Sequence, residues 1–246
     1  MLRAKITGLI LVLALAAAVP AGAVPVALEL ALGIDVSGSV DASEYTLQKN
    51  GYINAFNNIA AFGPFSPFAV TYYEWSGASE QSQLVAWTLV TNTAEASAFA
   101  ALIGGTSRAF SGLTAVGSAI SYGAGLFNGN GFEGTRLVLD ISGDGETNDG
   151  GSTTAARDAA AAAGITINGL PIGGASINAF YTNNVITAGG FTVPADSFAD
   201  FQGAVFSKLQ REITPPPSIP EPGTMLLMGI GAAGVTFMRR RKGAKA

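Results

Sequence analysis

The chain of 246 residues contains no cysteine and no histidine. These absences exclude disulfide bonds, zinc sites built on thiolates or imidazoles, cysteine nucleophiles and serine–histidine–aspartate triads. Charged residues are also scarce, at 12% against about 25% in average soluble proteins. Any metal ion must therefore be held by oxygen ligands, and any hydrolysis would depend on carboxylates.

Positive charge is scarce in the middle of the chain. Of the 13 Lys and Arg residues, six lie between Val24 and Pro222, whereas all 17 acidic residues lie in this span, which gives it a net charge of −11. So acidic a surface argues against nucleic acid as a partner. It favours divalent cations and partners that are basic or bridged by a metal.

Residues 1–23 have the organisation of a secretory signal peptide. A basic start (Arg3, Lys5) is followed by an apolar centre, Ile6 to Val19, and by the small residues Ala21-Gly22-Ala23. A retained membrane anchor is the alternative, but the apolar run is shorter than the roughly 20 residues needed to span a bilayer. We predict export through the inner membrane and removal of this segment after Ala23.

The C-terminal end resembles a sorting signal. Residues 214–222 form a proline-rich linker that ends in Pro220-Glu221-Pro222, and residues 223–246 hold an apolar stretch followed by a cluster of basic residues from Arg239. The apolar stretch predicts a membrane helix with its C-terminus in the cytoplasm. The combination resembles the PEP-CTERM signal of Gram-negative bacteria.

That resemblance implies recognition by an exosortase, transient residence in the inner membrane and removal of the tail. The protein would then reach the cell surface or the extracellular matrix. The alternative is a plain C-terminal anchor, which would leave the protein in the inner membrane.

Residues 24–213 are expected to form one α/β domain. Apolar runs alternate with helical patterns, which predicts a doubly wound, mostly parallel sheet with helices on both faces and one antiparallel edge strand. The expected strands are 26–36, 68–75, 82–90, 135–142, 165–172 and a short edge strand at 191–193. The expected helices are 42–62, 91–103, 115–127, 149–163, 176–187 and 195–213.

The segment Asp35-Val36-Ser37-Gly38-Ser39 follows the first predicted strand and precedes a helix opened by Asp41. One carboxylate and two hydroxyls therefore stand at the carboxyl end of a strand, where open α/β sheets bind their ligands. Hard oxygen ligands suit Mg²⁺, with Mn²⁺ or Ca²⁺ as alternatives. An ordinary turn, in which these side chains only cap the helix, is the competing interpretation.

Two further segments offer oxygen ligands at strand or loop ends. Thr114 closes a loop rich in Gly and Ser, immediately before a predicted helix, and Asp144 follows a buried strand between Gly143 and Gly145. In a doubly wound sheet these segments would converge with Asp35 on one edge. Asp140 is a rival carboxylate, but its place inside the strand favours a structural role, and we favour Asp144.

The set Asp35-x-Ser37-x-Ser39, Thr114 and Asp144 resembles the metal-ion-dependent adhesion site (MIDAS) of von Willebrand factor A (vWA) domains. The resemblance implies Mg²⁺ held by the two serines, with Asp35, Asp144 and Thr114 bound directly or through water. One coordination position would stay open for an acidic group of a partner. In one departure from the pattern, a glycine intervenes before Asp144 where many such domains read Thr/Ser-Asp-Gly.

A closer resemblance is to a bacterial subfamily of vWA domains of unknown function. It rests on four short segments: Tyr73-Glu74-Trp75-Ser76-Gly77, Trp87-Thr88, Ser142-Gly143-Asp144-Gly145 and Gly169-Leu170-Pro171-Ile172.

Other polar and aromatic residues are weaker candidates. Glu74 either lines the rim of the site or is an exposed carboxylate at a strand end, and we favour the second. Trp75 and Trp87 are expected to pack in a hairpin rather than stack on carbohydrate. Arg108 is either a solvated loop charge or a contact for an anionic ligand. Three residues beside Asp144 would hydrogen-bond water near the metal or cap the next helix: Glu146, Asn148 and Asp149.

These features favour a binding module over an enzyme. The expected partner is a protein or a carboxylated polysaccharide that completes the coordination of the metal. A metal-dependent hydrolase is one alternative, since Mg²⁺ polarises phosphoryl and carbonyl oxygens, but the chain has no histidine. A purely structural matrix component is the other.

Overall fold

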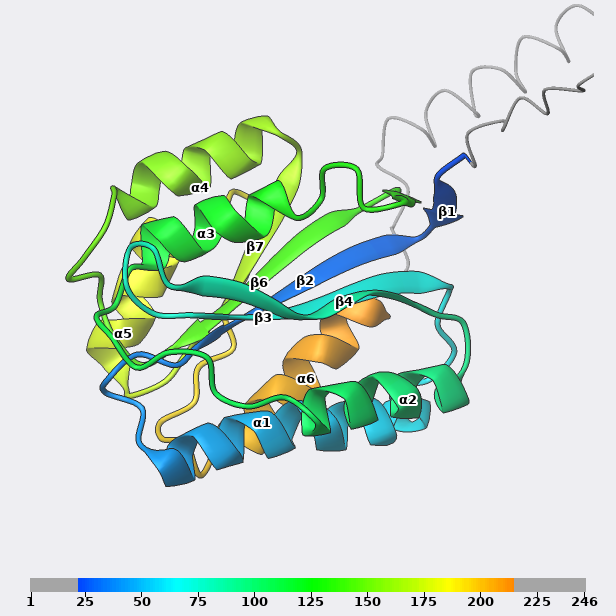
Figure 1. The fold of residues 1–246 in the computed structure, drawn as a ribbon, viewed down its shortest axis with the longest axis horizontal. Coiled ribbons are helices and arrows are strands. Elements are labelled where there is room, and N and C mark those ends of the chain that lie inside the picture. Colours follow the sequence, from blue (N-terminus) through cyan, green and yellow to red (C-terminus); the bar gives the residue numbers. More distant parts are fainter. Residues whose placement is uncertain (1–21, 215–246) are drawn as a thin grey trace, which may run out of the picture.

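The computed structural model describes residues 22–214. Its centre is a five-stranded sheet in the order β4-β3-β2-β6-β7 (Figure 1). Only β4 is antiparallel to its neighbour, so the predicted fold class is confirmed. The strands are β2 (Leu28–Asp35), β3 (Phe68–Trp75), β4 (Gln81–Val90), β6 (Leu137–Gly143) and β7 (Ile165–Pro171).

Helices cover both faces of the sheet (Figure 1). One face carries α1 (Ala42–Asn57), α2 (Thr93–Gly104) and α6 (Phe201–Ile213). The other carries α3 (Val116–Gly125), α4 (Thr153–Ala162) and α5 (Ala175–Phe180). Each face has its own apolar core, and the buried core residues that the structure describes lie between residues 28 and 213.

The central strand β2 is buried along its whole length. Leu30, Leu32 and Ile34 point into the core under α1 and α6, whereas Ala31 points into the core under α3. A strand covered on both faces reads as a continuous apolar run, which is why its position could be predicted from the sequence. The strand delivers Asp35 to the carboxyl edge of the sheet.

The start of α1 is fixed by a capping box. The Asp41 side chain accepts hydrogen bonds from the backbone of Ser43 and Glu44, and the Glu44 carboxylate accepts one from the backbone N–H of Asp41. This reciprocal arrangement satisfies helix-start N–H groups that would otherwise lack partners. It ends the loop after β2 at a defined residue.

Several predicted boundaries were wrong. The first helix ends at Asn57 and is followed by a separate 3₁₀ turn, Ile59–Phe62. The last helix begins at Phe201 instead of residue 195, and the predicted helix 176–187 is α5 followed by a π-helical turn, Tyr181–Val185. Residues 191–193 form an isolated bridge to β7 at Thr192 instead of a strand.

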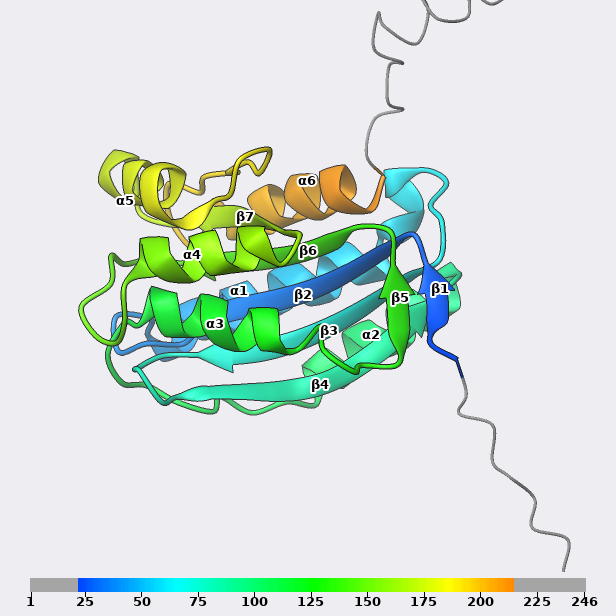
Figure 2. The same cartoon turned by 90° about the horizontal axis from the view of Figure 1, so that it is seen from above.

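A small second sheet was missed. β1 (Val24–Val26) pairs in parallel with β5 (Phe132–Gly134), and Figure 2 shows the two side by side at one end of the molecule. Each strand has three residues, too few for alternation to be recognised. Glu29 of β2 ties β5 to the main sheet, because its carboxylate accepts hydrogen bonds from Asn130 and Gly134.

Between residues 22 and 214, no helix has the length and apolar character to cross a membrane. The predicted membrane helix within residues 223–246, the proline-rich linker after residue 214 and nearly all of the predicted signal peptide lie outside the described residues.

Candidate metal centre

Three loops meet at the carboxyl edge of the sheet, and each is hydrogen-bonded to the other two. Gly38, after β2, donates its N–H to the Gly112 carbonyl at 2.8 Å. Ser39 Oγ donates to Asp144 Oδ1 at 2.7 Å. The third link joins the Thr114 N–H to Asn148 Oδ1 at 2.8 Å. The convergence expected from the topology is therefore present.

Asp35 lies at this edge with no exposed surface. Its Oδ1 accepts the Ser37 N–H at 2.7 Å, whereas its Oδ2 has no hydrogen-bond partner within the described part of the chain. Burial raises the pKa of Asp35 to about 7, although hydrogen bonds from Ser37 act in the opposite direction. A buried carboxylate oxygen without a partner is costly, and a bound cation would supply the missing interaction.

Hydroxyl groups complete the oxygen set. Ser37 Oγ lies 3.2 Å from Ser39 Oγ, which also contacts Asp144. The Thr114 hydroxyl lies beside Gly145, since a β-carbon on that glycine would be 3.6 Å from Thr114 Oγ1. Two carboxylates and three hydroxyls suit a hard divalent cation, whose other ligands would be water. Residues 22–214 contain no metal-suited cluster of three or more carboxylates, so the site depends on its hydroxyls.

Asp140, the rival carboxylate, is occupied elsewhere. Strand alternation turns it to the face of the sheet covered by α6, where Lys208 Nζ lies 2.6 Å from its Oδ1. Lys208 also lies 2.6 Å from Glu212 Oε1, and both members of the Asp140–Lys208 pair are fully buried. This carboxylate therefore serves the attachment of α6, as its position inside the strand suggested.

Glu74 contradicts its prediction as an exposed carboxylate, because it is completely buried. It accepts hydrogen bonds from Tyr45 Oη at 2.9 Å, Tyr72 Oη at 3.1 Å and the Ala109 N–H at 2.8 Å. Burial raises the pKa of Glu74 above its ordinary value. The loop that precedes Thr114 covers the end of β3, and local sequence contains no sign of this cover.

Arg108 is neither a free loop charge nor aimed at an outside ligand. Its Nε donates to the Phe110 carbonyl at 2.9 Å, and one NH2 group donates to the carbonyls of Val36 at 2.8 Å and Ser37 at 2.9 Å. The guanidinium therefore ties the loop before Thr114 to the loop after Asp35. Its planar set of donors is suited to such multiple contacts.

The remaining sequence candidates surround this edge or pack below it. Asn148 contacts Thr114, Asp149 Oδ2 accepts the Ala78 N–H at 2.7 Å, and Glu146 is exposed. Trp75 is buried in the core under α3, and Trp87 packs against Phe127 and Phe132. Both tryptophans pack internally, as the sequence suggested.

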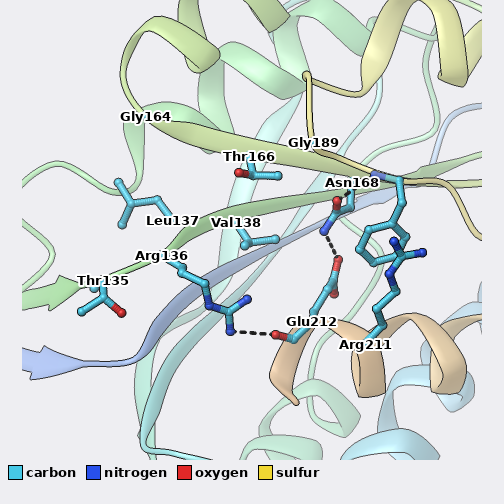
Figure 3. Close-up of a pocket in the computed structure, with 12 residues that line it drawn as sticks. Thr135, Arg136, Leu137, Val138, Gly164, Thr166, Asn168, Gly189, Arg211 and Glu212 are labelled. Carbon is cyan, nitrogen blue, oxygen red and sulfur yellow. Dashed lines mark hydrogen bonds between the residues drawn. The ribbon is translucent and has the colours of Figure 1, made fainter. Parts of the chain in front are cut away.

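A separate pocket of about 580 Å³ lies at the opposite edge, where β6 and β7 begin (Figure 3). Arg136 donates to the Glu212 carbonyl at 2.9 Å, and Asn168 donates to Glu212 Oε1 at 2.8 Å. The Arg211 guanidinium stacks 3.7 Å from the centre of the Phe191 ring. These contacts anchor the end of α6 to the sheet and lie apart from the candidate metal centre.

The sheet order, the helices on both faces and the three joined loops define a vWA-like domain. A family model described as "Protein of unknown function (DUF1194)" matches residues 25–217, and the chain belongs to this family. The model of the PEP-CTERM protein-sorting motif matches residues 218–242, so the predicted sorting signal is confirmed. No curated protein matches the chain in sequence.

Several solved structures have the same fold. Proximal thread matrix protein 1 from the mussel byssus aligns with a TM-score of 0.56 at 18% identity, over 78% of this chain and 46% of that one. The pilus adhesin SpaC from Lactobacillus rhamnosus GG aligns with a TM-score of 0.57 at 15% identity, over 76% and 30%. BatB from Bacteroides thetaiotaomicron aligns with a TM-score of 0.50 at 19% identity, over 75% and 98%.

The chain thus spans less than half of the mussel protein. A further structure of that protein, with a TM-score of 0.51 at 20% identity over 78% of this chain and 45% of that one, is described as having a zinc-occupied MIDAS motif. At these identities the likeness establishes the fold.

Proposed function

We propose that this protein is exported and binds a partner protein at the cell surface or in the extracellular matrix through a divalent cation. Asp35, Ser37, Ser39, Thr114 and Asp144 would hold the cation, with Mg²⁺ as the preferred ion and Mn²⁺ or Ca²⁺ as alternatives. The observation that carries the proposal is the fully buried Asp35 Oδ2, which has no hydrogen-bond partner among residues 22–214 and lies within three mutually hydrogen-bonded loops. A bound cation would offer an open coordination position to a carboxylate of the partner.

Export is supported by the sorting motif at residues 218–242. An exosortase would act on this tail, with transient residence in the inner membrane before release. The predicted signal peptide at residues 1–23 would start the same route.

The charge around the site favours a protein over a polyanionic polysaccharide. The rim carries exposed or half-exposed carboxylates, among them Asp41, Glu44, Glu80, Glu146 and Asp149. Like charges repel a chain of uronates, whereas a single carboxylate flanked by neutral or basic groups would reach the cation with less opposition.

Two cations lie near this edge, fewer than the five rim carboxylates, and their hydrogen-bond donors are used within the domain. Arg108 donates to three backbone carbonyls, and Lys49 donates to the Thr106 carbonyl. The bound metal would therefore be the main positive feature offered to a partner.

The binding role is better supported than the two alternatives. The loops are already joined by their own hydrogen bonds and by Arg108, so an ion is not needed merely to crosslink them. Hydrolysis would require a general base besides the ligands, and since Asp35 and Asp144 would be occupied by the metal, this base would have to come from the solvated rim carboxylates.

Retention of extracellular material on coated beads tests this function. Beads coated with residues 24–222, either unchanged or with Asp35→Ala, would be incubated with secreted material in buffer that contains Mg²⁺ or EDTA. We expect retention that needs both Mg²⁺ and Asp35 and is lost when the material is first treated with a protease. Equal retention in EDTA would contradict metal-dependent binding, and survival of protease treatment would contradict a protein partner.

A further inference from the structure

The Tyr181 hydroxyl has no assigned role and an unusual position. Tyr181 opens the π-helical turn that continues α5, and its ring is fully buried in the core under α3 and α4. Within residues 22–214 its hydroxyl finds no hydrogen-bond partner. Buried tyrosine hydroxyls usually have a partner, and π-helical turns are frequent at functional sites.

Asp35 Oδ2 and the Tyr181 hydroxyl face the same small space. A β-carbon on Gly143 would lie 2.6 Å from Asp35 Oδ2 and 2.6 Å from the Tyr181 oxygen. Two oxygens that lie 2.6 Å from one point are no more than twice that distance apart, and they come this close to the backbone only because residue 143 has no side chain. A hydrogen bond from the tyrosine hydroxyl to the carboxylate, direct or through one water molecule, would satisfy both oxygens.

We propose that Tyr181 positions Asp35 for metal binding, by donating a hydrogen bond from its hydroxyl to Asp35 Oδ2, directly or through one water molecule. The inference rests on the proposed metal site. A hydrogen bond to the carboxylate favours its ionised form and fixes its orientation, as groups behind metal ligands commonly do. It also gives a physical reason for the glycine that separates this chain from the Thr/Ser-Asp-Gly pattern.

The test compares substitutions of two buried tyrosines, Tyr181 and Tyr73. Tyr181→Phe removes the unpaired hydroxyl, and Tyr73→Phe is the matched control. Tyr73 is fully buried in the same core, but its hydroxyl donates to the Ala119 carbonyl at 2.9 Å. Calorimetric titration of Mg²⁺ into residues 24–222 and the Tm of the metal-free protein are measured for both variants.

We expect Tyr181→Phe to lower the affinity for Mg²⁺ by about 10-fold or more, the usual effect of removing a group behind a metal ligand. The Tm of the metal-free variant should fall no further than that of Tyr73→Phe, because each variant loses one hydrogen bond of a buried hydroxyl. Tyr73→Phe should keep its Mg²⁺ affinity.

An unchanged Mg²⁺ affinity in Tyr181→Phe would overturn the inference, and so would a loss confined to the Tm of the metal-free protein. Asp35→Ala separates this failure from failure of the metal site. If unmodified protein binds Mg²⁺ and Asp35→Ala does not, an intact Tyr181→Phe affinity overturns only the role of Tyr181. If unmodified protein gives no saturable binding, the proposed function is overturned as well.

Discussion

Ser39 Oγ donates a hydrogen bond to Asp144 Oδ1 across 2.7 Å, although the two residues are 105 positions apart in the chain. The contact joins the loop after β2 to the loop after β6. Because neighbouring parallel strands end at the same edge, the sheet brings the two side chains together. This pair therefore connects the topology of the domain with its candidate chemistry.

Removing the charge of Asp140, on β6, and of Asp144, in the loop after β6, should have different effects. Asp144→Asn is expected to weaken Mg²⁺ binding strongly and to change stability little, because Asp144 is partly exposed. Asp140→Asn should leave Mg²⁺ binding intact and lower the free energy of unfolding by about 3 kcal/mol, since Lys208 would lose a buried partner. Calorimetry and urea unfolding distinguish them, and loss of binding in Asp140→Asn alone would reverse the assignment.

Gly143→Ala and Gly145→Ala form a second matched pair. The methyl group of Gly143→Ala would meet Asp35 Oδ2 and the Tyr181 hydroxyl at 2.6 Å, so these groups must move. Gly145→Ala would meet Thr114 only at 3.5 Å or more, an ordinary contact. We expect Gly143→Ala to lower Mg²⁺ affinity at least about 10-fold and stability by about 1–3 kcal/mol, with smaller effects of Gly145→Ala. Equal Mg²⁺ affinities of the two variants would show that the space at residue 143 is unimportant.

Loss of the Arg108 guanidinium should loosen the loops without removing a metal ligand. Arg108→Ala breaks three hydrogen bonds to backbone carbonyls and is expected to cost about 2 kcal/mol. Arg108→Lys should restore little of this, because an ammonium group cannot reproduce the planar set of donors. The measurement is hydrogen exchange of the backbone amides of residues 35–39. If these amides are as well protected in Arg108→Ala as in the unmodified protein, Arg108 does not tie the two loops together.

Glu74 should give stability a measurable pH dependence. Its folded-state pKa is raised above the ordinary 4.5, mainly by burial. The folded protein therefore binds a proton more readily than the unfolded chain, so the contribution of Glu74 to stability falls as pH rises from 4.5 to its raised pKa. The Glu74→Gln variant lacks this contribution. Its free energy of unfolding, relative to that of the unmodified protein, should therefore increase across that pH range. A difference in the free energy of unfolding between the two proteins that does not change with pH would contradict this prediction.

The sequence was informative where the signal is local. The alternation of apolar and helical segments predicted the sheet, and Asp35, Ser37 and Ser39 lie within five residues at the end of a buried strand. Asp144 followed from the rule that parallel strands end at one edge, and Thr114 followed from its place in a Gly- and Ser-rich loop immediately before a helix. The MIDAS resemblance added the expected role of each oxygen.

The missed features all depend on contacts between distant segments. Glu74 is buried because Tyr45 and Ala109 reach it from elsewhere in the chain, and Arg108 bonds to carbonyls more than 70 positions away. Tyr181 opens a π-helical turn far along the chain from Asp35, yet both side chains contact the position of Gly143. Periodicity reports which face of an element is apolar, and it does not report which side chain from another element lies opposite.

Calorimetric titration of Mg²⁺ into residues 24–222, beside Asp35→Ala and Asp158→Ala, tests the central claim most directly. Asp158 is an exposed carboxylate on α4 that pairs with Arg157, so its variant controls for the loss of one surface charge. We predict saturable binding of one Mg²⁺ per chain in the unmodified protein and in Asp158→Ala, and none in Asp35→Ala. Identical weak responses from all three proteins would contradict the metal centre, and the proposed adhesive function with it.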